Sequence, residues 1–255
     1  MNAPAHVRQR FDALTGYPGA HREPEALHLL ERYPDLAVIL AAKALAIVSP
    51  AELERRAVIT QQLTRSAGQW LELTGQRGAC LSTCNNLLLA LESENIPCIA
   101  MTGSLEIWPH SPGIGSVMFA ALNTDTPIGH TWVISAPYLI VDPSIGSNNY
   151  APNLKAIIPS VILERKVRAT TPSLEAVFSA DLKDLLGGQL STQLASDMLG
   201  VNLEQLWSLL PSQQIRTETL ALEYTPVRLM PSFDQHNPTV FTPKIWQRSP
   251  SARAS

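Results

Sequence analysis

The sequence is poor in charge, and it lacks both long basic runs and long apolar runs. Charged residues make up 16% of its 255 residues, the net charge is −3, and no basic run exceeds two residues. Because a nucleic-acid binder contacts several phosphates through clustered cations, we expect no nucleic-acid partner. The longest apolar stretch, from Leu36 to Val48, contains Lys43 and is too short to span a bilayer. We therefore also expect no membrane association.

An apolar signal segment is absent from the first ten residues, which read MNAPAHVRQR. With 45% apolar residues the chain can bury a substantial core, and its length suits one large domain or a core with an appended piece. We therefore predict a globular, cytoplasmic protein. Export by a non-classical route, as for an effector, stays an open alternative because it needs no apolar signal.

Cysteine is scarce, and the three cysteines are Cys80, Cys84 and Cys98. An odd, clustered set of this kind does not form a disulfide framework. Structural zinc would need a fourth ligand and the usual Cys-x2-Cys pairing, whereas the spacings between these cysteines are x3 and x13. We therefore expect no metal site, and no organic cofactor is required. The remaining interpretations are a thiol nucleophile or buried apolar side chains.

Residues 1–75 are predicted to form a helical subdomain. The strongest start signal combines Ser49, which can cap a helix, with Pro50, whose φ angle is preset for the first helical position. Gly75 supplies the stop. An earlier helical stretch covers residues 25–48 and is predicted to break at Pro34.

Residues 76–150 change character and are predicted to form the core. A helix from about Cys80 to Glu94 carries apolar residues on one face. A segment rich in proline, glycine and serine, residues 108–115, is predicted to be a surface loop. One helix followed by sequence-local strands favours an antiparallel α+β fold. The strand-like runs cover residues 98–102, 117–122, 131–135 and 139–142.

Residues 151–230 are predicted to be a mixed elaboration of the core, and residues 231–255 a loose tail rich in proline and serine. The elaboration has strand-like runs over 156–168 and 216–229 and helical stretches over 173–186 and 191–210. A faint helix-turn-helix pattern within the last helical stretch lies in an acidic region. That charge has the wrong sign for DNA.

Cys80 occupies a position that favours a reactive thiol. It lies just after Gly78, at the first turn of the predicted helix, where the orphan amides and the helix dipole stabilise an anion and lower a thiol pKa. The amide of Cys80 would provide half of an oxyanion hole. Cys84 lies on the apolar face of the helix and Cys98 lies in a strand, so we interpret both as packed core residues.

His130 is the best candidate for a base, because it opens a strand that is predicted to hairpin into a second strand ending at Asp142. A regular hairpin with a two-residue turn at Ala136-Pro137 would point His130 and Asp142 to opposite faces. An odd-length loop or a β-bulge would bring both side chains to one face. A triad of Cys80, His130 and Asp142 therefore predicts a loop or bulge of that kind.

Several motifs resemble the transglutaminase-like branch of the papain-like cysteine-enzyme superfamily. The resemblance implies a papain-like α+β core, with Cys80 as nucleophile, His130 as general base and acid, and Asp142 as its orienter. It also implies attack on a protein, peptide or small amide through a thioester, which water or a primary amine resolves. The motifs are Gly78-Ala79-Cys80, Asn95-Ile96-Pro97, Gly103, His130-Thr131-Trp132-Val133 and Asp142-Pro143-Ser144.

Two alternatives stay open beside this resemblance. The stretches from Arg77 to Cys80 and from Tyr138 to Asp142 also resemble arylamine N-acetyltransferases, which would make the protein an acetyl-CoA-dependent acyltransferase. However, Arg77 lies one residue closer to the thiol than in that family, and Trp132 suits the transglutaminase-like pattern better. The alternative from another class is a catalytically inactive binding or adaptor module on the same fold.

The second donor of the oxyanion hole is not identified by any motif. Gln76 and Trp70 are the nearest polar candidates upstream of Cys80, and Gln69 is more distant. Trp132 is a further candidate for an oxyanion or substrate contact. In the transglutaminase-like pattern an arginine or lysine usually follows the Ile-Pro step, whereas this chain has Cys98.

Overall fold

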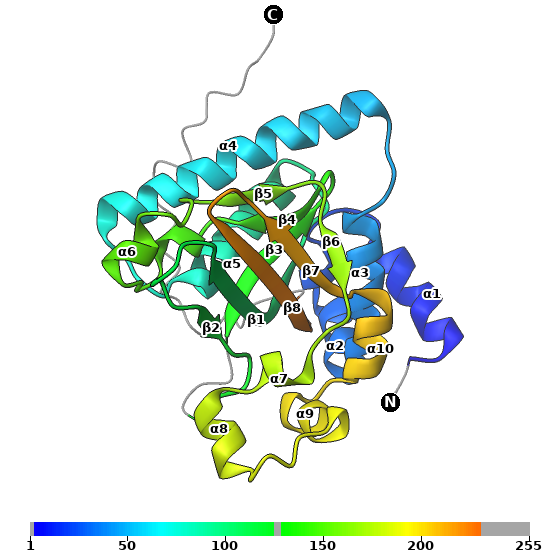
Figure 1. Cartoon of the computed structure of the whole chain (residues 1–255). Helices are drawn as coiled ribbons and strands as arrows, with labels where there is room; N and C mark the ends of the chain where they lie inside the picture. Colours follow the sequence, from blue (N-terminus) through cyan, green and yellow to red (C-terminus); the bar gives the residue numbers. More distant parts are fainter. Residues whose placement is uncertain (1–2, 125–128, 231–255) are drawn as a thin grey trace, which may run out of the picture.

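An antiparallel sheet of eight strands organises the fold, which the computed structural model describes for residues 3–124 and 129–230. Its strand order is β5-β4-β3-β1-β8-β7-β6, and β2 pairs with β1 beside this path (Figure 1). All strand pairs are antiparallel, and helices pack on the sheet, so the predicted α+β class is confirmed. The predicted tail, residues 231–255, lies outside the described residues.

The first 75 residues contain helices and no strand within the part described. The helices are α1 (Ala5–Leu14), α2 (Pro24–Arg32), α3 (Ala37–Ala44) and α4 (Pro50–Thr74). A short 3-10 turn, η2 (Pro34–Leu36), separates α2 from α3, so the predicted break at Pro34 is confirmed.

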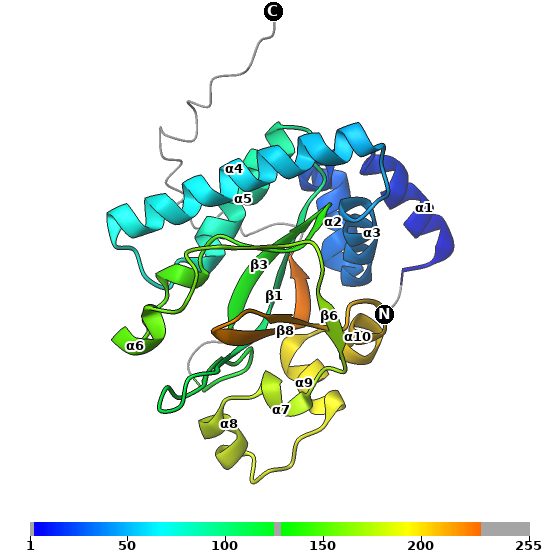
Figure 2. The same ribbon diagram turned by 45° about the horizontal axis from the view of Figure 1, so that its top comes forward.

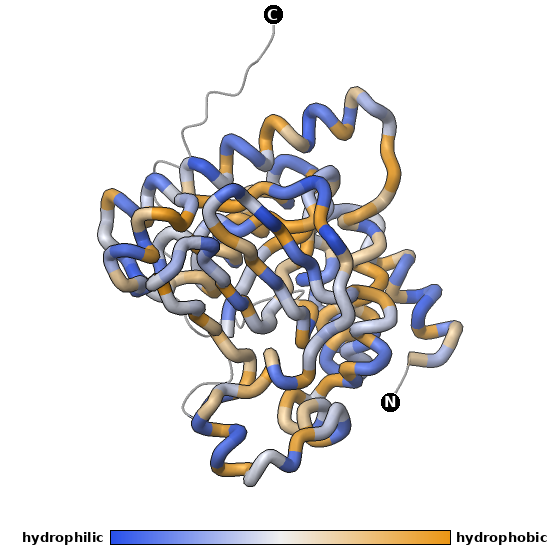
Figure 3. Tube along the Cα trace, in the orientation of Figure 1, coloured by the Kyte–Doolittle hydropathy of each residue, from blue (hydrophilic) through white to orange (hydrophobic). Residues whose placement is uncertain are grey.

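Both predicted ends of the long helix α4 are confirmed. At its start, the Ser49 hydroxyl accepts a hydrogen bond from the Glu52 amide, and Pro50 is the first helical residue. At its end, Gly75 adopts a left-handed conformation (φ 64°) that closes the helix. Hydrophilic and hydrophobic segments alternate along α4 (Figure 3), as expected for a helix with one buried face.

Helix α5 (Cys80–Ser93) lies between the sheet and α4 (Figures 1 and 2). Its leucines Leu87, Leu88 and Leu91 are buried against Val133 and Val141 of the sheet and other apolar residues. Burial of each leucine side chain contributes about 1.5–3 kcal/mol. This packing fixes the amino end of α5 relative to the strands.

The strands next to α5 follow the predicted order. They are β1 (Ile99–Pro109), β2 (Val117–Phe119), β3 (His130–Ser135) and β4 (Tyr138–Asp142). The prediction was wrong for the end of the first strand, because β1 continues from 102 to Pro109 through glycine, serine and glutamate. These residues have weak strand signals of their own, and they are strand because β8 pairs along them.

The carboxyl-terminal part supplies a central strand of the same sheet. Its strands are β5 (Ile162–Glu164), β6 (Arg168–Thr170), β7 (Ser212–Arg216) and β8 (Leu220–Met230), and β8 pairs with both β1 and β7. Its helices are α6 (Pro152–Lys155), α7 (Leu174–Val177), α8 (Ala180–Leu185), α9 (Thr192–Leu199) and α10 (Leu203–Leu209).

Three predictions about this part were wrong in detail. The single strand over 156–168 is instead a turn after α6 followed by β5, and it reaches only the first residue of β6; β5 and β6 lie at opposite edges of the sheet. Each predicted helical stretch is two short helices, because Ser179 begins a new helix with its own cap and Gly200 (φ 66°) ends α9. The strand over 216–229 is divided by a turn between β7 and β8.

The two faces of the sheet are covered differently. α5 covers the face that bears Val133 and Val141, while α3 and α10 contribute to the core on the face that bears Trp132 and Ile134. Among the described residues, no helix is both long enough and apolar enough to cross a membrane.

Candidate active site

Cys80 is the first residue of α5 and lies beside the beginning of β3. Gly78 adopts a left-handed conformation (φ 62°), which glycine reaches without strain, in the turn that leads into the helix. One helical turn after Cys80, the Cys84 thiol donates a hydrogen bond to the carbonyl of Thr131 (3.3 Å). Since His130 precedes Thr131 in β3, this contact sets Cys80 near His130.

The β3–β4 hairpin contains the bulge that the triad prediction required. Ser135 pairs with Tyr138 across a two-residue turn, but Val133 pairs with Val141, so the register shifts by one residue between them. Continued from Val133, this register sets Asp142 opposite Trp132 and leaves His130 on the diagonal of the same face. Nε2 of His130 and Oδ2 of Asp142 are 2.6 Å apart.

Asp142 is fully buried, and both of its carboxylate oxygens are hydrogen-bonded. Oδ2 also accepts from the Tyr224 hydroxyl (3.0 Å), and Oδ1 accepts from the amide (2.9 Å) and the hydroxyl (3.1 Å) of Ser144. Burial by itself raises the pKa of Asp142, but the positive charge of His130 and these donors outweigh it and lower the pKa. The carboxylate is therefore held ionised.

Gly103 makes the close packing around His130 possible. It pairs with His130 of β3 and with Pro226 of β8, at the point where the β1–β8 register is irregular. A Cβ atom at position 103 would lie 2.0 Å from the Thr225 carbonyl oxygen and 2.9 Å from the Trp132 ring. Only glycine allows β8 to come this near, and β8 carries Tyr224.

The charges of the site favour a thiolate and an imidazolium. Burial lowers the pKa of His130, but the charge and hydrogen bond of Asp142, together with Cys80, raise it to about 10. Burial raises the pKa of Cys80, but the interaction with His130 outweighs this, and the Leu81 amide adds to the lowering. At neutral pH, Cys80 therefore has a stronger tendency to ionise than an ordinary cysteine.

The nitrogen of His130 left for the thiol is Nδ1. It is buried and makes no hydrogen bond of normal geometry with any described residue, because Asp142 engages the other nitrogen. The Cys80 sulfur is near enough for each group to shift the pKa of the other.

Cys84 and Cys98 have the opposite character. Both thiols are buried and donate to backbone carbonyls, Cys84 to Thr131 and Cys98 to Leu88 (3.7 Å). Burial raises the pKa of each well above the ordinary cysteine value. Our interpretation of both as packed core residues is confirmed.

The sequence candidates for the second oxyanion donor differ in their exposure. Gln76 and Gln69 are exposed, and Trp70 is half-buried on α4. Trp132 is fully buried and packs edge-on against Tyr224 (5.1 Å between ring centroids). Among the described residues, no hydrogen bond joins any of the four to Cys80.

Sequence reasoning missed three aromatic residues around His130. Tyr224 reaches Asp142 from β8, and the Phe119 ring lies 6.2 Å from the imidazole. Tyr150 packs edge-on against Phe119, with ring centroids 5.9 Å apart. Tyr150 follows Asp142 closely in the chain, but nothing in the sequence pairs Tyr224 with Asp142.

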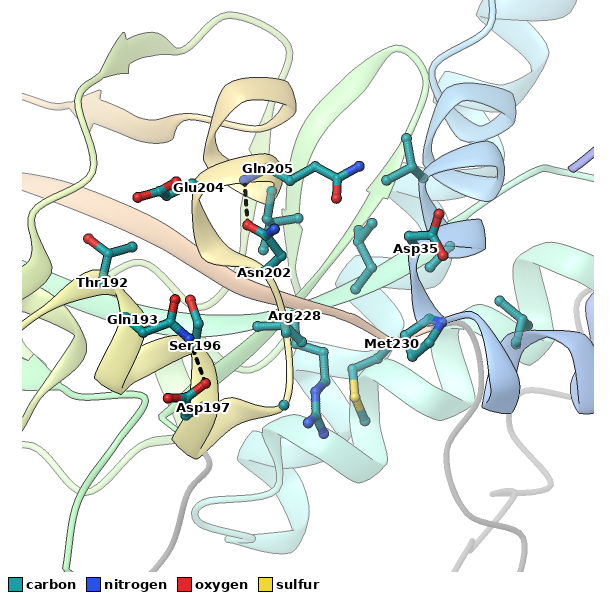
Figure 4. A pocket seen from close by; sticks show the side chains of 18 residues that line it. Asp35, Thr192, Gln193, Ser196, Asp197, Asn202, Glu204, Gln205, Arg228 and Met230 are labelled. Atoms are coloured by element: carbon teal, nitrogen blue, oxygen red, sulfur yellow. Dashed lines mark hydrogen bonds between the residues drawn. The ribbon is translucent and has the colours of Figure 1, made fainter. Parts of the chain in front are cut away.

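Two cavities lie away from these residues. One, of about 700 Å³, lies between the α2–α3 segment and helices α9 and α10, with Arg228 and Met230 of β8 in its lining (Figure 4). The other, of about 280 Å³, is lined by His21, Arg56 and Cys98, among others. Neither cavity is lined by Cys80, His130 or Asp142, so the candidate active site lies outside both cavities. In the described part of the chain, no group of three or more histidine, cysteine, aspartate or glutamate side chains is arranged so that it could hold a metal ion.

Comparisons of the chain with protein-family models, with curated proteins and with solved structures found no match. The functional argument therefore rests on the geometry of Cys80, His130 and Asp142.

Proposed function

We propose that the protein is a cysteine-nucleophile enzyme that transfers an acyl group from an amide through a thioester, on a transglutaminase-like, papain-like core. One observation carries this proposal. The buried His130–Asp142 pair, in which both carboxylate oxygens are hydrogen-bonded, lies beside the one thiol of three whose pKa is lowered. The position of that thiol at the first turn of a helix packed on an antiparallel sheet supports the same interpretation.

In the first step, the Cys80 thiolate attacks the carbonyl carbon, and the carbonyl electron pair moves onto oxygen. The amide of Cys80 at the helix start stabilises this oxyanion. His130 then gives its Nδ1 proton to the leaving nitrogen, the C–N bond breaks, and an amine and a thioester on Cys80 result. Asp142, at Nε2, holds the imidazole in place and stabilises its positive charge.

In the second step, water or a primary amine attacks the thioester. His130 removes a proton from this nucleophile, the C–S bond breaks, and Cys80 leaves as the thiolate. Hydrolysis, deamidation and transamidation share these steps and differ in the acceptor that the site admits.

The proposal is tested by formation of the thioester from p-nitrophenyl acetate, an activated ester. We expect one acetyl group on the protein, mapped to Cys80 by peptide mass spectrometry and released by hydroxylamine. Cys84→Ala is the matched control and should acetylate at the wild-type rate, whereas Cys80→Ala should not acetylate. A folded wild-type protein that forms no adduct at Cys80 would support the inactive adaptor instead.

The acyl donor is then identified with two candidate donors, glutamine peptides and acetyl-CoA. Ammonia release from glutamine peptides, with incorporation of a fluorescent primary amine, would identify a transamidase, and ammonia release without incorporation a deamidase. Acetylation of Cys80 by acetyl-CoA would favour the arylamine N-acetyltransferase-like alternative.

A further inference from the structure

An oxyanion hole in an acyl-transfer site needs a second donor besides the amide of Cys80. Of the sequence candidates, Gln76 and Gln69 are exposed, and Trp132 is fully buried. Tyr150, in contrast, is half-buried next to the site. It therefore has both access to solvent, from which a substrate enters, and proximity to His130.

The chain holds Tyr150 on the His130 side of the site through aromatic packing. β4 ends at Asp142, and after the 3-10 turn η3 (Ile145–Ser147) the chain returns to the site at Tyr150. The Tyr150 ring meets Phe119 edge-on, at an interplanar angle of 81°, and Phe119 in turn contacts the imidazole of His130. The rings of Tyr150, Phe119 and His130 thus form a row of spatial contacts.

The hydroxyl of Tyr150 has a proton to donate. Its oxygen accepts a hydrogen bond from Nδ2 of Asn148 (3.3 Å), which is a buried side chain. Because that oxygen acts as the acceptor, its own proton points elsewhere, and no described residue accepts it. Asn148 therefore orients the hydroxyl and leaves its proton for another acceptor.

The charges around Tyr150 are those of the reaction centre. Burial raises the pKa of Tyr150, and the negative charges of Asp142 and Cys80 raise it further. These charges act on the hydroxyl in agreement with the aromatic packing that holds Tyr150 on the His130 side of the site. They also keep it protonated at any pH at which the enzyme would work.

We propose that the Tyr150 hydroxyl is the second donor of the oxyanion hole, opposite the amide of Cys80. This inference rests on the proposed acyl-transfer function. In the tetrahedral intermediate, the oxyanion accepts one hydrogen bond from the Cys80 N–H and one from the Tyr150 O–H. The tyrosine keeps its proton throughout, so Tyr150 stabilises charge and transfers nothing.

The test compares two electrophiles on the same thiol in Tyr150→Phe. Iodoacetamide reacts by displacement at a saturated carbon and forms no oxyanion, so its rate at Cys80 should stay within about twofold of wild type. p-Nitrophenyl acetate passes through a tetrahedral oxyanion, so its rate should fall about 100-fold, as when one oxyanion donor is removed elsewhere. The variant keeps the ring that packs on Phe119, and a thermal melt checks its fold.

Two further variants control for the hydroxyl itself. Tyr138→Phe removes a phenol hydroxyl that faces Arg165, away from the site, and should leave both rates unchanged. Asn148→Ala keeps the Tyr150 hydroxyl but removes its orienting donor. It should lower the acetylation rate less than Tyr150→Phe does and spare the alkylation rate.

Each other outcome overturns the role of Tyr150. Equal loss of both rates would mean that Tyr150 acts on the thiolate, and no loss of either would mean that another group is the donor. Rapid alkylation of wild-type Cys80 without acetylation would mean that no oxyanion hole is formed. Slow alkylation of wild-type Cys80 would instead overturn the thiol-enzyme proposal, and the role of Tyr150 with it.

Discussion

The molecule contains two buried groupings of a thiol, an imidazole and a carboxylate, and they differ in character. The first is Cys80, His130 and Asp142. In the second, Nε2 of His21 lies 3.7 Å from Oε1 of Glu92, and Cys98 lines the same small cavity as His21. All six side chains are more than nine-tenths buried, so burial does not distinguish the two groupings.

Hydrogen bonds to the carboxylate distinguish them. Asp142 has donors on both oxygens, whereas Oε1 of Glu92 has no hydrogen-bond donor in the described part of the chain. Arg22 pairs with the other oxygen of Glu92 at 3.0 Å, yet burial outweighs it and raises the pKa of Glu92. A buried carboxylate thus stays ionised when donors replace its lost water.

The effect of the charges also differs. At the first grouping, Nε2 of the imidazole is hydrogen-bonded to the carboxylate, and Asp142 and Cys80 both raise the pKa of His130. At the second, burial and the charge of Glu92 both raise the pKa of Cys98. The pKa of the thiol is therefore lowered in one grouping and raised in the other, although both contain the same three kinds of side chain.

The largest expected effect is a difference between His130 and His21 in their influence on the reactivity of Cys80. His130→Ala should slow the alkylation of Cys80 by iodoacetamide at pH 6 about 100-fold or more, because an unpaired thiol with a pKa near 8.5 is almost entirely protonated there. His21→Ala should leave that rate unchanged. The measurement is the rate of peptide modification by mass spectrometry, and equal rates in the two variants would contradict the comparison.

The second-largest expected effect is a difference in how much Asp142 and Glu92 contribute to the stability of the fold. Asp142→Asn should lower the free energy of unfolding at pH 7 by about 3 kcal/mol, because it breaks a buried ion pair. Glu92→Gln should lower it by about 1 kcal/mol or less, because its environment already disfavours the charge. Urea denaturation measures both, and a larger loss in Glu92→Gln would reverse the comparison.

The pH dependence of stability should differ in sign between the carboxylates. The lowered pKa of Asp142 gives stability that is present above the ordinary aspartate pKa of about 4 and is lost as the pH falls through the folded value. The raised pKa of Glu92 makes the folded state gain stability as the pH falls through that raised value. In denaturation curves from pH 3 to 7, Asp142→Asn should remove the loss of stability at low pH. Glu92→Gln should remove the gain of stability at low pH.

His130 should also make the free energy of unfolding depend on pH in the alkaline range. Its raised pKa gives stability that is fully present below the ordinary value of 6.5 and is lost as the pH rises through about 10. We expect the free energy of unfolding of the wild type to decline across this range. The decline should be absent in His130→Ala, and a decline of equal size there would argue against a charged His130.

The smallest expected effect concerns one donor. Tyr224→Phe removes one hydrogen bond from Asp142 and should lower stability by about 1–1.5 kcal/mol. Because Tyr224 also holds the Asp142 carboxylate in position against His130, alkylation of Cys80 at pH 6 should slow about tenfold or less. Unlike Tyr150→Phe, this variant should slow alkylation and acetylation together. Unchanged alkylation would mean that Tyr224 does not act through Asp142.

The local part of this fold could be predicted from the sequence. Ser49 and Gly75 mark the ends of α4, Cys80 begins α5, and simple strand arithmetic required the bulge between His130 and Asp142. In each case the information lies within a few residues of the feature or in a single hairpin. The papain-like family assignment remains a prediction.

The rest of the fold and of the candidate site depends on contacts between segments that are distant in the chain. Residues 103–109 become strand because β8 pairs with them, and Tyr224 reaches Asp142 through that same pairing, 82 residues away in the chain. Tyr150 and Phe119 meet from separate segments of the chain. Strand propensity depends on such partners, so no local pattern of residues indicates these contacts.

The most direct test of the account is the alkylation rate of each cysteine in the native protein, measured with iodoacetamide from pH 5 to 9. We expect rapid modification of Cys80 that persists below pH 7, and slow modification of Cys84 and Cys98 that rises only toward alkaline pH. Equal, slow modification of all three thiols, with a midpoint for Cys80 at or above the ordinary pKa of about 8.5, would contradict the thiolate–imidazolium pair.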